Sequence, residues 1–176
     1  MPDIRKPSLT SVLGEMFDTH VAGAEFAIEV LGGGTVGDVR RISGRAFIEG
    51  GVRPFSLVLK TQLKWDRHGD PDCWRREYAI YKDGLDRRLF PSIKMPRCYL
   101  LDEAEESTHI WMEYVEGATG STELHASELA LAAEKLGELQ AEFHLNGQRD
   151  LPYLRRYPAV RSSFGTAEWA KTPWMR

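Results

Sequence analysis

The feature that most constrains this chain is a run of three glycines at positions 32–34, between two segments rich in strand-forming residues. A regular element does not continue through three glycines, because glycine loses more backbone entropy on ordering than other residues. The flanking segments, 25–31 and 39–49, are predicted to be strands. With residues 55–62, which follow the hairpin turn at 50–51, they predict an antiparallel meander whose first loop is glycine-rich.

The spacing of hydrophobic residues changes after this meander. Between Asp72 and Leu85, apolar side chains recur every three or four residues, which predicts a helix with Asp72 as its cap. The other predicted elements are a short amphipathic helix over 8–20, strands over 98–102 and 109–115, and a long helix over 123–145. The order is therefore helix, three strands, helix, two strands, linker and long helix, which indicates an α+β fold.

Charge and composition argue against several classes of partner. The 23 basic and 26 acidic residues are mixed along the 176-residue chain and give a net charge of -3, so no basic patch for nucleic acid stands out. No apolar run approaches the roughly 18 residues of a membrane span. Cys73 and Cys98 lack metal-ligand spacing, and no signal peptide precedes them. We expect a cytoplasmic protein that binds neither nucleic acid nor membrane.

The glycines form a recognisable phosphate-binding pattern. Gly32, Gly34, Gly37 and Val39 fit G-x-G-x-x-G-x-V, in which the lack of side chains lets backbone amides close over phosphate oxygens. The shorter G-x-G-x-x-G also marks dinucleotide-binding folds, but those require a helix directly after the glycines. Here a strand is predicted at that place, which favours a loop of a β-hairpin.

Lys60 and Glu77 are a candidate ion pair. Lys60 ends the segment 57–60, which resembles the V-A-I-K strand of kinases, where the lysine reaches the α and β phosphates. Glu77 lies on the next predicted helix, where a kinase places the carboxylate that pairs with this lysine. Taken alone, Lys60 is more typical of a surface lysine at a strand end, and Glu77 of a solvated helix charge.

Residues 110–117 form a hydrophobic strand that runs into a glycine-marked linker. In kinases the similar segment is the hinge, whose backbone groups pair with adenine. By that resemblance Met112 is the gatekeeper, and the Glu113 carbonyl and Val115 amide bind the base. The alternative is an edge strand with a core methionine.

Together, these segments resemble the N-terminal half of the aminoglycoside phosphotransferase and choline kinase superfamily, over residues 22–145. The resemblance implies a protein-kinase-like N-lobe over 1–115, with a small antiparallel sheet and an αC-type helix, and then the hinge exit and an incomplete helical C-lobe over 116–176. It also implies ATP and Mg²⁺ as cofactors and a small hydroxylated substrate that accepts the γ-phosphate. The implied nucleotide-binding residues are Gly32, Gly34, Gly37, Val39, Val58, Lys60, Glu77, Met112, Glu113 and Val115.

The catalytic loop of that family, H-G-D-x-x-x-x-N, has no counterpart after the hinge. The triplet at 68–70 matches its first letters, but it precedes the predicted helix and has Arg75 where Asn should be. We therefore expect a chain truncated before the catalytic loop, with no catalytic residue or magnesium ligand of its own, and a long helix with an exposed apolar face. Two alternatives stay open, a non-catalytic kinase-like binding module and a structural domain whose glycines serve only turns.

Overall fold

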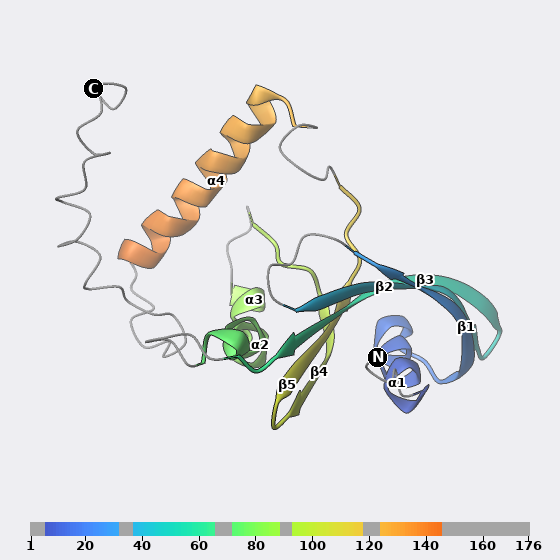
Figure 1. Cartoon of the computed structure of the whole chain (residues 1–176). Coiled ribbons are helices and arrows are strands. Elements are labelled where there is room, and N and C mark those ends of the chain that lie inside the picture. Colours follow the sequence, from blue (N-terminus) through green and yellow to red (C-terminus); the bar gives the residue numbers. More distant parts are fainter. Residues whose placement is uncertain (1–5, 32–36, 66–71, 89–92, 118–123, 146–176) are drawn as a thin grey trace, which may run out of the picture.

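The computed structural model describes residues 6–31, 37–65, 72–88, 93–117 and 124–145 (Figure 1). The described chain is α+β, with one open sheet of five antiparallel strands and a few helices. This confirms the predicted class and the antiparallel sheet. In chain order the elements are α1 (Lys6–Phe17), β1 (Val21–Val30), β2 (Asp38–Ile48), β3 (Gly51–Leu63), a 3₁₀ turn η1 (Cys73–Arg75), α2 (Arg76–Lys82), α3 (Leu85–Arg88), β4 (Cys98–Ala104), β5 (Ser107–Glu113) and α4 (Ala126–Leu145).

The strands lie in the order β1-β2-β3-β5-β4. The first three form the predicted meander, and the second hairpin adds to β3 through β5, so that β4 lies at the edge. Strand β5 ends at Glu113, two residues before the predicted end, because its pairing with β3 ends where Glu113 faces Leu57. Tyr114 and Val115 therefore follow the strand.

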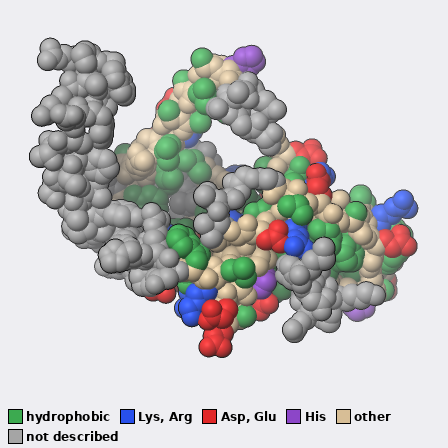
Figure 2. Space-filling model, viewed as in Figure 1, with side chains coloured by type: hydrophobic (Ala, Val, Ile, Leu, Met, Phe, Trp, Pro, Cys, Tyr) green, Lys and Arg blue, Asp and Glu red, His purple; other side chains and the backbone are tan. Residues whose placement is uncertain are grey.

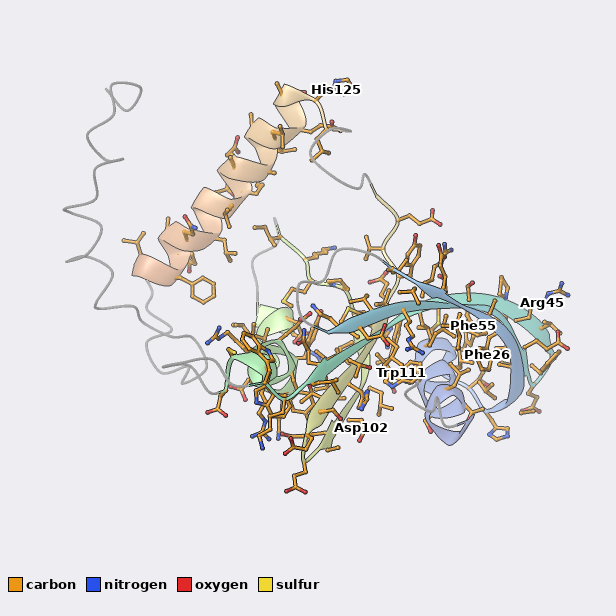
Figure 3. All side chains as sticks on the ribbon, viewed as in Figure 1. Phe26, Arg45, Phe55, Asp102, Trp111 and His125 are labelled. Carbon is orange, nitrogen blue, oxygen red and sulfur yellow. The ribbon has the colours of Figure 1, made fainter. Side chains whose placement is uncertain are left out.

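Side chains on the two faces of this sheet enter two separate clusters, because successive residues of a strand point to opposite faces. On one face, α1 packs over the sheet, and Phe55 and Trp111 lie on that side (Figure 3). The buried members of this cluster are Leu9, Val12, Leu13, Val21, Ile42, Ala46, Phe55, Leu57, Leu59 and Trp111. On the other face, Ile110 and Met112 pack against Tyr78 and Tyr81 of α2. The α2 face is the one that carries the candidate site.

The helix predicted between Asp72 and Leu85 is interrupted. The first turn is 3₁₀, and Asp72 occupies the predicted position directly before it, but the Asp72 side chain makes no capping hydrogen bond. Gly84 has φ 66° and separates α2 from α3, since glycine adopts this left-handed conformation without steric cost. The predicted apolar positions are nevertheless buried, namely Trp74, Tyr78, Tyr81 and Leu85.

Both other helices are shorter than predicted. Helix α1 ends at Phe17, because Asp18 takes φ 52° and the Thr19 amide turns back to the Gly14 carbonyl at 3.3 Å. Helix α4 begins at Ala126 and has exposed apolar side chains (Figure 2); its exposed leucines are Leu129, Leu131, Leu136 and Leu145. Within the described ranges, no helix is long and apolar enough to cross a membrane.

Candidate functional site

Lys60 and Glu77 form an ion pair between the sheet and α2. Lys60 is on β3, on the face opposite α1, and Glu77 lies in the first turn of α2, where its Oε2 pairs with the lysine Nζ. Helix α2 lies beside the β3-β5-β4 part of the sheet (Figure 1). The two side chains are 27% and 32% exposed, so the pair is less screened by solvent than a fully exposed one, and its ammonium can still be reached by an anion.

Four of the predicted site residues share one face of the sheet. In the β2–β3 register Val39 is opposite Lys60, and in the β3–β5 register Val58 is opposite Met112. Directly opposite residues of an antiparallel pair point to the same side. Val39, Val58, Lys60 and Met112 therefore lie on the α2 face, which is also where Glu77 meets Lys60.

Gly37 is fixed at the end of the glycine-rich loop by a close backbone approach. It has φ 117°, and a Cβ there would lie 2.8 Å from the Thr61 carbonyl oxygen. A side chain at this position would therefore be strained and would clash with β3 next to Lys60. On either side of the loop, the backbone is joined by a hydrogen bond from the Leu31 amide to the Val39 carbonyl at 2.8 Å. Gly32 and Gly34 lie outside the described residues.

The predicted hinge residues have different environments. Met112 is buried at the α2 face. The Glu113 amide donates to the Arg97 carbonyl at 2.8 Å, and its carboxylate accepts from the Arg97 amide at 3.1 Å. Val115 follows the end of β5 and is 60% exposed. The adenine contacts of the Glu113 carbonyl and the Val115 amide stay predictions.

Arg41 of β2 lies on the same face of the sheet, opposite Val58, and was not predicted as a site residue. Its Nε donates to Ser56 Oγ at 2.9 Å, and its guanidinium lies 4.0 Å from the centre of the Tyr114 ring. One guanidinium nitrogen is 3.9 Å from the Glu29 carboxylate. The period of two along β2 could have placed Arg41 on the same face as Val39, but its partners come from three other segments.

Cys98 is on this face as well, in the cluster with Met112. Burial, together with a smaller effect of the nearby Asp86 charge, raises the pKa of its thiol to about 11. Since the thiolate is the reactive form, only roughly one Cys98 side chain in ten thousand is reactive at pH 7.

In a Cys73→Ser variant, we expect alkylation of Cys98 by iodoacetamide to be slow at pH 7 and to accelerate about tenfold per pH unit up to pH 10. Peptide mass spectrometry at several pH values measures this, and a rate that levels off near pH 8.5 would contradict it.

The sequence matches no protein-family model and no curated protein. In the described part of the chain, no group of three or more His, Cys, Asp or Glu side chains could hold a metal ion. The site is thus a lysine with a carboxylate partner, placed beside the end of a glycine-rich loop and a small apolar surface. Such an arrangement can bind an anion through the ammonium and a planar apolar group through the neighbouring side chains.

Proposed function

We propose that this chain is the ATP-binding part of a small-molecule kinase, which transfers the γ-phosphate of ATP to a hydroxyl group of a small substrate. The observation that carries the proposal is the ion pair of Lys60 with Glu77, beside Gly37 at the end of the glycine-rich loop. The resemblance of the segment order to the aminoglycoside phosphotransferase and choline kinase superfamily supports it. In this proposal residues 1–115 are the nucleotide-binding lobe, and the protein acts in the cytoplasm.

Each part of the site has a role in this proposal. The Lys60 ammonium binds the α and β phosphates, and Glu77 holds it toward them. Amides of the glycine-rich loop cover the phosphates, while Val39 and Val58 pack on the adenine ring and Met112 limits the depth of the site. Mg²⁺ bound together with the nucleotide would offset part of the phosphate charge. The proposal concerns nucleotide binding, because no catalytic aspartate or metal-binding acid was found among the segments that carry the resemblance.

The direct test is calorimetric titration of the purified chain with MgATP. We expect a saturable single site whose occupancy is reduced by excess adenosine, since both ligands share the adenine contacts. The titration is repeated at a second temperature, because a binding enthalpy near zero at one temperature changes with the heat capacity of binding. A folded protein, shown by circular dichroism, that gives no binding heat at either temperature would contradict the proposal and favour a structural domain.

A further inference from the structure

Glu103, on the edge strand β4, is paired with cations at both ends of α2. Arg75 precedes the helix directly, and its Nη2 pairs with Glu103 Oε1. Lys82 is the last residue of the helix, and its Nζ is 3.5 Å from Glu103 Oε2. The carboxylate is the least exposed member, with 23% of its side chain accessible against 45% for Arg75 and 60% for Lys82. One acid on the sheet therefore contacts the start and the end of α2.

We propose that Glu103 is a positioning residue. It fixes the rotation of α2 about its axis and its position along that axis, so that Glu77 meets Lys60. This inference rests on the proposed function, because it assumes that the ion pair of Lys60 with Glu77 binds phosphate. Helix α2 has only seven residues, and helices this short are not stable by themselves, so contacts with the sheet must fix their place.

The apolar contacts of α2 leave its orientation incompletely fixed. Tyr78 and Tyr81 pack on the sheet beside Met112, but hydrophobic packing is not directional, so it sets the distance of the helix from the sheet better than its rotation. Hydrogen-bonded ion pairs are directional. Glu103 makes one such hydrogen-bonded pair, with Lys82, and a second ion pair with Arg75, seven positions earlier in the chain. Held at two points, the helix resists both rotation and sliding.

The two cations are held in place by neighbouring rings. The Arg75 guanidinium lies 5.2 Å from the Trp74 ring centre, and the Lys82 ammonium lies 5.5 Å from the Tyr78 ring centre. Because these contacts restrict the long side chains before they pair, less side-chain entropy is lost in each ion pair than for two free surface residues. In the space-filling view, acidic and basic side chains gather at the end of the β4–β5 hairpin (Figure 2).

The test compares Glu103→Gln with Glu106→Gln in the full chain. Glu106 lies in the β4–β5 turn, pairs with Lys64 at 2.8 Å and is 69% exposed, so its replacement makes the same change of charge without touching α2. We expect Glu103→Gln to lower ATP affinity about fivefold and to change adenosine affinity by less than about twofold. Glu106→Gln should leave both affinities within about twofold of wild type.

A purely structural role for Glu103 predicts a different pattern, in which ATP and adenosine affinities fall together. That result, or equal ATP affinities for the two variants, overturns the proposal.

Hydrogen exchange separates failure of this inference from failure of the proposed function. Without nucleotide, amides of residues 76–82 should exchange about fivefold faster in Glu103→Gln than in wild type, and at the wild-type rate in Glu106→Gln. Unchanged exchange in both variants shows that Glu103 does not hold α2. If exchange rises in Glu103→Gln but wild type binds no ATP, α2 is anchored as proposed and the nucleotide-binding function is wrong.

Discussion

Replacing Gly44 by alanine is expected to lower the free energy of unfolding by about 3 kcal/mol or more, through overpacking against a neighbouring strand. Gly44 lies in β2 opposite Phe26 of β1. A Cβ at position 44 would lie 2.0 Å from the Glu25 carbonyl oxygen and 2.8 Å from the Phe26 Cα. Both are backbone atoms, so no side chain can rotate away, and β1 must separate from β2 to make room.

Urea unfolding followed by circular dichroism measures this effect, with Gly23→Ala as the control. Gly23 is also a strand glycine of the β1–β2 pair, but a Cβ there would meet only the Phe47 ring, at 3.9 Å. We expect Gly23→Ala to change the free energy of unfolding by less than about 1 kcal/mol. Similar unfolding midpoints for the two variants would show that β1 and β2 are not packed as closely at Gly44 as the structure has them.

The strands and helices could be predicted because their signals are local. Alternating apolar residues, apolar residues at helical spacing and glycine turns are properties of short windows of sequence, and they predicted the meander and α4 to within a few residues. The break between α2 and α3 could not be found in this way, since Tyr81 and Leu85 continue the helical spacing across Gly84. Both are buried, so the hydrophobic pattern is the same with or without the break.

The site was predictable only where the spacing of two distant residues resembled that of a known family. Lys60 and Glu77 were expected to pair on that ground, and they do in the structure. Glu103 was missed because its partners depend on strand order: β5 pairs with β3, which puts β4 at the edge beside α2. The steric need for Gly37 also comes from another strand, through the Thr61 carbonyl. Neither strand order nor register can be read from a local pattern.

Replacing Lys60 by alanine is expected to lower ATP affinity roughly tenfold to hundredfold, because hydrogen bonds to charged groups contribute about 1.5–3 kcal/mol. The loss should be confined to ligands with phosphates, so adenosine affinity should stay within about twofold of wild type. Calorimetric titration of the variant with MgATP and with adenosine measures both. Equal ATP affinities for Lys60→Ala and wild type would remove Lys60 from the site and contradict the proposed function.

Lys64→Ala is the matched control for the Lys60 variant. Lys64 directly follows β3 and pairs with the exposed Glu106, so its removal costs the same charge near the same strand end. We expect its ATP affinity to stay within about twofold of wild type. A reduction as large as that of Lys60→Ala would indicate that ATP responds to the overall charge rather than to one ammonium.

Part of the Lys60→Ala effect should come from Glu77. Without its partner, the carboxylate faces the phosphates with an uncompensated negative charge, and like charges repel. Adding Glu77→Gln to Lys60→Ala should therefore recover a fraction of the lost ATP affinity, whereas Glu77→Gln alone should weaken ATP binding because Lys60 loses the group that holds it. This opposite sign in the two backgrounds is specific to a phosphate bound beside the pair. If Glu77→Gln weakens ATP binding equally with and without Lys60, Glu77 acts through the position of α2 and not through the lysine.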